Sequence, residues 1–345
     1  MLSDRIEGKW IDLFAEVFAL CKVARDEPCA VLSESQSRSL NVHLAELALH
    51  RLGARPFHVI VPTLRQTAPV PIRSTGASTV LQNLPQAIGT LAATPFVADC
   101  TLEGLMHAAE LPQILKGGTR VLYISNEHPD VLERLVPSPA DEQQVRAGMR
   151  LLREGKLLKV TSPAGTNLEI RLQGARVGGV WGYTEKPGTL SHWPGGLCLA
   201  FPAPQSVNGT LALAPGDINL TFKRYLESAV RLKVEADYVT AIDGTGLDAE
   251  LMREYFAAWG EREAYAVSHV GWGMNRRARW EALAMYDRSD VNGTEQRAFA
   301  GNFLYSTGAN EVAHRHTLGH FDLPLRGCTL AVDEEVIVRD GKLAG

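Results

Sequence analysis

A regular alternation of two apolar periodicities over about the first 150 residues restricts the fold more than any other feature. Apolar residues recur at helical spacing in four stretches: 8–25, 40–54, 83–93 and the run before Gly117. Short, nearly continuous apolar runs lie between them: 29–35, 56–62, 95–100 and 119–125. Strands that alternate with helices are typical of crossover units, in which the strands run parallel. The sequence therefore predicts an amino-terminal α/β domain with a Rossmann-like parallel sheet.

The pattern changes after a charged helix expected at about 140–155. Strands with turn residues between them are expected within 156–172, 208–220 and 230–246, and again from 320 to the end. Helices are expected at 247–259 and 275–286. We predict a boundary near residue 160, with the α/β domain at 1–160 and a mixed α+β domain at 161–345.

Charge and composition exclude several classes of function. The chain has 35 Lys and Arg against 39 Asp and Glu, a net charge of -4, which argues against nucleic acid as a partner. No apolar run reaches the roughly 18 residues of a membrane span, and the start has no secretory signal pattern, so a cytoplasmic protein is expected. Five scattered cysteines indicate reduced thiols. None of the predicted strands is followed by the G-x-G-x-x-G motif of a dinucleotide-binding site, and the chain has no G-x-S-x-G motif of a serine hydrolase.

The histidines carry most of the chemical information. In the segment HFDLPL, His320 and Asp322 are two residues apart, and on a strand such side chains project from one face. One imidazole and one carboxylate then form two thirds of a 2-His-1-carboxylate triad, which holds Fe(II) and leaves positions open. The pair predicts a metal site that needs a third ligand from elsewhere.

Two regions offer that third ligand. His269 lies where an apolar run meets an expected Gly-Trp-Gly turn, a place where sites on α/β scaffolds tend to open. His314 and His316 have the same i, i+2 spacing, but their polar neighbours favour a surface loop. The residues alone leave both choices open.

Other polar residues are candidates for the walls of a pocket. His192, expected in a glycine-rich loop beside Trp193, has the chemistry for an acid, a base or a hydrogen-bond donor. Arg297 and Ser306 lie in a stretch with strand character, where they would contact an anionic oxygen and a ring substituent. His107 precedes an expected helix.

Several long motifs resemble the 2,5-dihydroxypyridine 5,6-dioxygenases of bacterial nicotinate degradation, a family related in fold to the M29 aminopeptidases. The likeness covers most of the chain and is densest in GYTEKPGTLSHWPGG, SHVGWGMNRRARW, GNFLYSTG and HFDLPLRGC. The resemblance implies one Fe(II) held by His269, His320 and Asp322. It also implies a small aromatic substrate and O2 as partners, cleavage of the pyridine ring to N-formylmaleamate, and a homo-oligomer.

The resemblance further implies substrate-pocket roles for His192, Arg297 and Ser306, and acid–base work by His107 on a mobile loop. Two departures bear on the substrate. Val180 stands where relatives carry a glutamate, and the segment before His107 is about two residues longer than expected. The ring-cleaving chemistry therefore transfers more safely than the identity of the ring.

Two other functions compete with this interpretation. An aminopeptidase-like hydrolase would need a two-metal site with bridging carboxylates, for which Glu263, Glu281 and Glu311 are candidates. A binding protein without catalysis would leave a complete triad without a purpose. The number and kind of bound metal ions distinguish the three.

Overall fold

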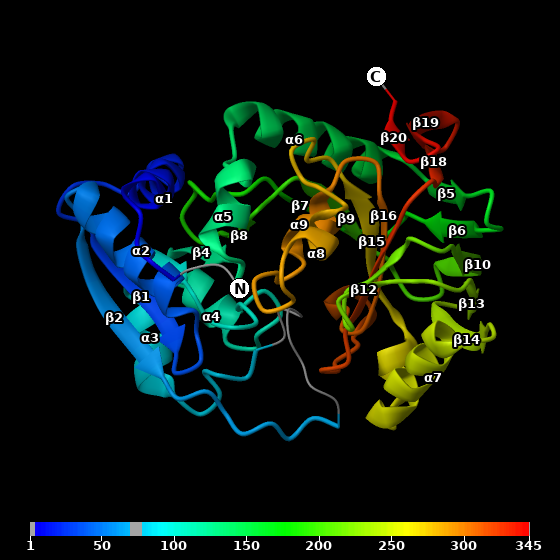
Figure 1. Ribbon diagram of the computed structural model, residues 1–345, viewed down its shortest axis with the longest axis horizontal. Coiled ribbons are helices and arrows are strands. Elements are labelled where there is room, and N and C mark those ends of the chain that lie inside the picture. Colours follow the sequence, from blue (N-terminus) through cyan, green and yellow to red (C-terminus); the bar gives the residue numbers. More distant parts are fainter. Residues whose placement is uncertain (1–3, 70–77, 345) are drawn as a thin grey trace.

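The computed structural model describes residues 4–69 and 78–344. Figure 1 shows two regions side by side, a parallel sheet flanked by helices and a set of antiparallel sheets beside α7. This arrangement confirms the predicted combination of a Rossmann-like α/β part with a mixed α+β part. No helix within the described ranges is long and apolar enough to cross a membrane.

The parallel sheet has five strands in the order β2-β1-β3-β4-β8. Their bounds are Pro28–Glu34 for β1, Arg55–Val61 for β2, Phe96–Asp99 for β3, Arg120–Ile124 for β4 and Leu190–Trp193 for β8. The first four match the predicted strands. The fifth, β8, comes from beyond residue 160, so the sheet draws on both sides of the predicted domain boundary, which stays a prediction.

Helices cover both faces of this sheet. The five helices are α1 (Gly8–Leu20), α2 (Ser39–Arg51), α3 (Pro85–Ala92), α4 (Leu111–Lys116) and the short α5 (Pro129–Leu132). On β1, Cys29 and Val31 face the cluster that contains α1 and α2, while Ala30 and Leu32 face the cluster that contains α3 and α4. Residues 29–32 are all buried, and burial on both faces accounts for this continuous apolar run.

The antiparallel part consists of two sheets that share one core with α7, Leu247–Trp259. The five-stranded sheet runs β17-β16-β15-β9-β7, with bounds Phe321–Leu325, Phe303–Thr307, Val267–Gly273, Leu197–Phe201 and Arg176–Val180. The eight-stranded sheet runs β14-β13-β10-β6-β5-β18-β19-β20, with bounds Tyr238–Asp243, Val230–Glu235, Val207–Leu213, Asn167–Arg171, Leu157–Thr161, Thr329–Val332, Glu335–Arg339 and Lys342–Leu343. Strands β11 (Ile218–Asn219) and β12 (Arg224–Tyr225) form a separate two-stranded sheet.

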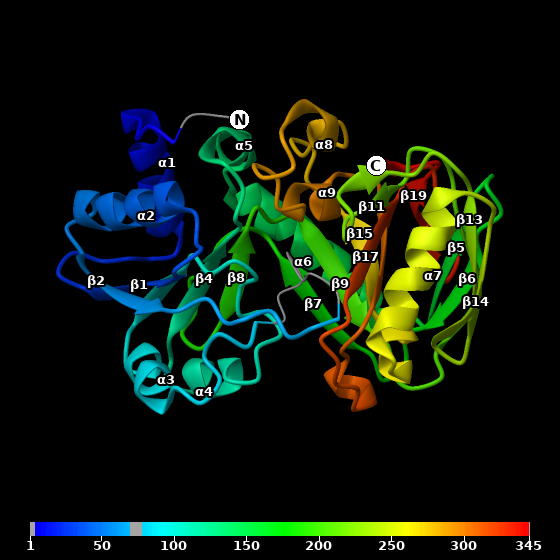
Figure 2. The same cartoon turned by 60° about the horizontal axis from the view of Figure 1, so that its bottom comes forward.

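Three connections join the parallel and antiparallel parts, and one of them is residues 181–189 between β7 and β8. Helix α6, Pro139–Glu154, begins at a capping box in which Ser138 and Asp141 bind each other's backbone N–H groups, and it packs on β7 and β9. The chain also passes from β8 to β9 through only Pro194, Gly195 and Gly196. The carboxyl end of the parallel sheet is therefore held next to the five-stranded antiparallel sheet (Figure 2).

Two local predictions were wrong for identifiable reasons. The predicted helix at 275–286 is reduced to α8, Ala282–Met285. The Arg279 N–H donates to Glu295 Oε1 and the Asn275 carbonyl oxygen accepts from the Ala300 N–H, so tertiary contacts replace the helical hydrogen bond from residue 279 to residue 275. The expected Gly-Trp-Gly turn is instead the end of strand β15. Glycine is needed there for close packing, since a Cβ on Gly271 would lie 2.0 Å from the carbonyl oxygen of Cys198.

Trp193 at the end of β8 is fully buried, packs edge-on against Phe14 and donates from Nε1 to the carbonyl oxygen of Leu135 at 2.9 Å. We expect Trp193→Ala to lower the free energy of unfolding by about 3–5 kcal/mol, because it leaves a large cavity. Trp193→Phe should cost about 1–3 kcal/mol through the unpaired carbonyl. Urea denaturation measures both, and a loss below about 0.5 kcal/mol for Trp193→Ala, the range of surface changes, would contradict the prediction.

Candidate metal centre and active site

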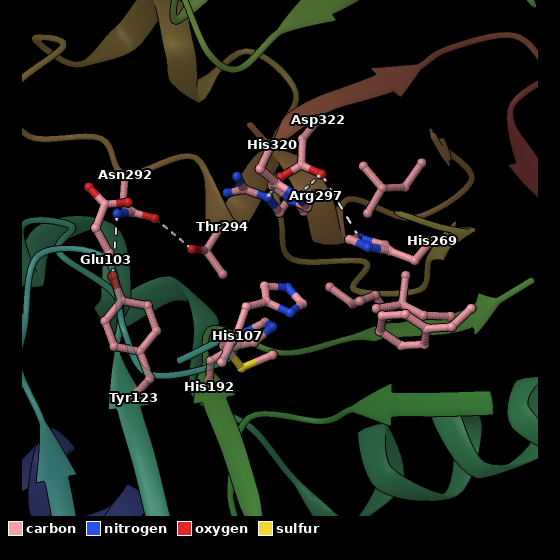
Figure 3. A pocket seen from close by; sticks show the side chains of 15 residues that line it. Glu103, His107, Tyr123, His192, His269, Asn292, Thr294, Arg297, His320 and Asp322 are labelled. Carbon is pink, nitrogen blue, oxygen red and sulfur yellow. Dashed lines mark hydrogen bonds and ion pairs between the residues drawn. The ribbon is translucent and has the colours of Figure 1, made fainter. Parts of the chain in front are cut away.

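Three predicted ligands meet on the two strands that flank β16 in the five-stranded sheet. His269 lies on β15, Asp322 lies on β17, and His320 immediately precedes β17. Ser306 of β16 is in register with both His269 and Asp322, so the ligands face one another across β16. His320 Nε2 lies 3.2 Å and His269 Nε2 lies 3.9 Å from Asp322 Oδ1 (Figure 3). Within the described residues, this is the one group of His, Cys, Asp and Glu side chains whose ligand atoms converge within 4.8 Å.

The Asp322 carboxylate is fixed by two further side chains. Ser306 Oγ donates a hydrogen bond to Oδ1, and Arg297 Nε donates to Oδ2 at 2.6 Å. Burial alone would raise the pKa of Asp322, but Arg297 and the nearby imidazoles hold it well below its usual value. The carboxylate is therefore ionised and held in one orientation. The Ser306 hydroxyl hydrogen is used in this bond to Asp322, and Ser306 does not line the pocket.

Hydrogen bonds also fix the tautomer of His269. Ser268 Oγ donates to the carbonyl oxygen of Ala309 at 2.5 Å, so towards His269 Nδ1, 3.1 Å away, it acts as acceptor. His269 Nδ1 thus carries the hydrogen, and the lone pair of Nε2 points toward Asp322. Burial lowers the pKa of His269 to about 3, which keeps the ring neutral. A neutral ring that donates its second N–H to a fixed oxygen is the usual state of a metal ligand.

His320 is held through its backbone. Tyr255 Oη on α7 donates to the carbonyl oxygen of His320 at 2.8 Å and accepts from its N–H at 3.2 Å. The competing histidines His314 and His316 are exposed and lie outside the cluster. Arg315 between them is buried and paired with Asp237, so the alternation of this loop turns the arginine inward and both imidazoles outward.

The donor set suits a ferrous ion. It consists of two neutral imidazole nitrogens and one carboxylate oxygen, all buried, with the neighbouring pocket on one side. Two histidines and one carboxylate with open positions are diagnostic of non-haem Fe(II) oxygenases. The residues present therefore fit the metal that the sequence predicts.

His192 lies at the end of β8, a strand rather than the expected loop. Its Nδ1 is 2.6 Å from the carbonyl oxygen of Pro194, which can only accept, so Nδ1 carries the hydrogen and Nε2 keeps its lone pair. Burial lowers the pKa of His192 to about 4. The ring is thus a neutral hydrogen-bond acceptor in the pocket wall.

His107 follows β3 on a loop that a buried carboxylate organises. Asp99 accepts hydrogen bonds from the backbone N–H groups of Thr101 and Leu105, and Glu34 accepts from that of Leu102. The His107 ring lies 5.5 Å from that of His320 and 6.4 Å from that of His269, measured between centroids. Burial, followed by the charge of His320, lowers the pKa of His107.

The pocket beside the triad has apolar walls and two polar ends. Leu197, Leu199, Phe201 and Leu304 form an apolar wall, and Val180 packs behind it in the same cluster. Arg297 also lines the pocket, but it lies on α9, Thr294–Ala298, and not on a strand as predicted. The reason is tertiary, since Glu127 accepts hydrogen bonds from the first N–H groups of this helical turn.

Four lining residues were not found from the sequence: Glu103, Tyr123, Asn292 and Thr294. They are isolated polar residues that follow no recognisable spacing in the sequence. Only the position of Glu103, four residues before His107, indicates a place near the site. The glutamates considered for a second metal, Glu263, Glu281 and Glu311, do not line the pocket.

Known proteins resemble this chain over almost its whole length. A profile of the NicX family, described as 2,5-dihydroxypyridine 5,6-dioxygenase, matches residues 9–345. The 2,5-dihydroxypyridine 5,6-dioxygenase of Pseudomonas putida KT2440 is 36% identical over 333 residues, which are 95% of this chain and 94% of that protein. A solved structure of 2,5-dihydroxypyridine dioxygenase from the same organism has a TM-score of 0.93 at 34% identity and covers 100% of this chain and 99% of its own.

A more distant likeness concerns the fold alone. Wild-type AmpT from Thermus thermophilus has a TM-score of 0.58 at 12% identity, covering 98% of this chain and 99% of that one. This agrees with the expected kinship in fold to the M29 aminopeptidases. The matches over the full chain, together with the triad and its pocket, lead to one assignment: the chain belongs to the 2,5-dihydroxypyridine 5,6-dioxygenase family.

Proposed function

We propose that this chain is an Fe(II)-dependent dioxygenase that cleaves a hydroxylated pyridine ring and incorporates both atoms of O2. The first candidate substrate is 2,5-dihydroxypyridine, which would give N-formylmaleamate. The observation that carries the proposal is the buried group of His269, His320 and Asp322 at one end of a pocket with apolar walls, in a member of this family.

The ligands determine what the site binds. Bound Fe(II) supplies open positions where the ring and O2 meet and electrons pass between them. Two neutral imidazoles and one carboxylate leave a net charge of about +1, which favours a substrate with an ionised hydroxyl group. Arg297, whose guanidinium holds Asp322 Oδ2, adds a second positive charge beside that oxygen.

Two histidines are placed to handle protons. The Nε2 lone pair of His192 accepts a hydrogen bond from a ring hydroxyl or removes its proton, while the Pro194 carbonyl stabilises the hydrogen on Nδ1. His107 lies over the triad and delivers a proton to the opened ring. The apolar wall keeps the flat ring in place and excludes water.

Anaerobic reconstitution with one equivalent of Fe(II), followed by oxygen uptake with a panel of hydroxylated rings, tests the proposal. Stoichiometric uptake with loss of the ring's near-ultraviolet absorbance is the expected result with 2,5-dihydroxypyridine. Release of amino acids from peptides with two zinc or cobalt ions, and no oxygen uptake, would favour the hydrolase instead. No observation in the structure favours that alternative, because the three candidate glutamates lie outside the pocket.

Replacing one ligand should remove metal and activity together. We expect Asp322→Ala to bind no stoichiometric iron and to lose ring cleavage, because two imidazoles alone hold the metal weakly. His316→Ala is the matched control and should keep both, since His316 is exposed. Iron analysis and oxygen uptake measure the outcome. Full activity with stoichiometric iron in Asp322→Ala would refute the ligand set.

Ser306→Ala separates two roles for this hydroxyl. Since Ser306 Oγ donates to Asp322, its loss should weaken Fe(II) binding about 10–100-fold and leave KM for the ring unchanged once iron is saturating. Ser191→Ala, next to His192 but outside the pocket, should change neither quantity. A raised KM at saturating iron would instead support the predicted contact between Ser306 and the substrate.

His192→Gln should lower kcat by about 10²–10⁴-fold, the usual contribution of a positioned acid or base. The low pKa of His192, about 4, means that its neutral form persists as pH falls from 8 to 5 and is lost only below that range. The pH profile of kcat/KM should therefore show no His192-dependent loss between pH 5 and 8. An acid limb near pH 6.5 that vanishes in His192→Gln would show this assignment to be wrong.

A further inference from the structure

The active-site pocket has a second polar end, away from the triad. Glu103, Tyr123, Asn292 and Thr294 line it and form a separate group, with His107 and His192 on one side of the space between the two ends (Figure 3). All four are buried. They come from three segments: the loop after β3, the end of β4 and the segment that leads into α9.

Hydrogen bonds within this group run in one direction. Thr294 Oγ1 donates to Asn292 Oδ1 at 2.9 Å, and Asn292 Nδ2 donates to Tyr123 Oη at 3.5 Å. Tyr123 Oη in turn donates to the carbonyl oxygen of Leu102 at 3.1 Å. Each hydroxyl hydrogen is thereby used, so the two hydroxyl groups can offer only oxygen lone pairs to a ligand.

The charge of this end is negative. Burial, and then the carboxylates of Glu103, Asp99 and Glu127, raise the pKa of Tyr123 well above its usual value. Gly104, the residue after Glu103, packs directly against the phenol ring, since its φ is +73° and a Cβ there would lie 2.8 Å from Tyr123 Cγ. The pocket is thus polarised, with the Arg297 guanidinium at the triad end and the Glu103 carboxyl group at the other.

We infer that Glu103 is a specificity-determining residue, which accepts a hydrogen bond from an N–H or O–H group on the ring edge remote from the triad. The inference rests on the proposed function for the orientation of the ring. A ring bound through one hydroxyl at the triad directs its opposite edge toward Glu103, between the apolar walls. In 2,5-dihydroxypyridine the C2 oxygen lies opposite the 5-hydroxyl, and the ring N–H of the pyridone form lies beside it on that edge. A 2-methoxy ring has a lone pair on this nitrogen instead.

The test compares two rings on the iron-loaded protein without oxygen. Dissociation constants for 2,5-dihydroxypyridine and 5-hydroxy-2-methoxypyridine are measured by calorimetry with the wild type, Glu103→Gln and Glu110→Gln. Glu110 belongs to the same loop but lines a neighbouring cavity, so Glu110→Gln is the matched control. The wild type should prefer the N–H ring roughly tenfold to hundredfold, as for a hydrogen bond to a charged group.

Glu103→Gln should reduce this preference to within about threefold, because it weakens binding of the ring that carries the N–H group. An unchanged preference in Glu103→Gln, or an equal loss in Glu110→Gln, would overturn the inference. Should Glu103→Gln fail to fold, Glu103→Asp withdraws the carboxylate by one methylene and is expected to reduce the preference about tenfold. A Glu103→Asp variant with the same preference as the wild type would then overturn the inference.

The two proposals fail in different ways. A wild type that prefers the N–H ring but consumes no oxygen would refute the dioxygenase and leave the role of Glu103 standing. A wild type that consumes oxygen with both rings and binds them equally well would refute only the role of Glu103.

Discussion

The buried Asp322 carboxylate is the interaction on which the rest of the site depends. Ionised carboxylates are costly to bury unless they are paired, and here Arg297, Ser306 and two imidazoles surround one. These partners come from α9, β16, β15 and the residue before β17. The register of the sheet and the position of α9 together bring them to the Asp322 carboxylate. A metal ion would complete the compensation, because it adds positive charge where the carboxylate oxygen and the imidazole lone pairs converge.

Much of this organisation could be predicted from the sequence. The first four strands of the parallel sheet follow from their apolar runs, and β1, β3 and β4 are buried on both faces while the edge strand β2 is partly exposed. The convergence of His320 and Asp322 follows from i, i+2 spacing at a strand, a property of the backbone alone. The choice of His269 over His314 and His316 needed more, since spacing left both possible and only the resemblance to a family separated them.

The parts that could not be predicted depend on contacts between distant segments. Arg297 sits on a helical turn because Glu127, far away in the chain, accepts hydrogen bonds from its N–H groups. The expected helix at 275–286 fails because the Arg279 N–H donates to Glu295 Oε1 and the Asn275 carbonyl oxygen accepts from the Ala300 N–H. Glu103 and Tyr123 reach the pocket only because β3 and β4 end at the same edge of one sheet. No local pattern encodes such partners.

The pairing of β8 with β4 has a consequence for how the protein can be divided. A fragment that ends near residue 160 would retain four strands of the parallel sheet but lose β8, leaving the backbone N–H and C=O groups of β4 that face β8 without partners. Such an open, apolar edge is a template for pairing with other chains, so the fragment should aggregate rather than behave as an independent module. The two regions are thus distinct in architecture but inseparable in folding.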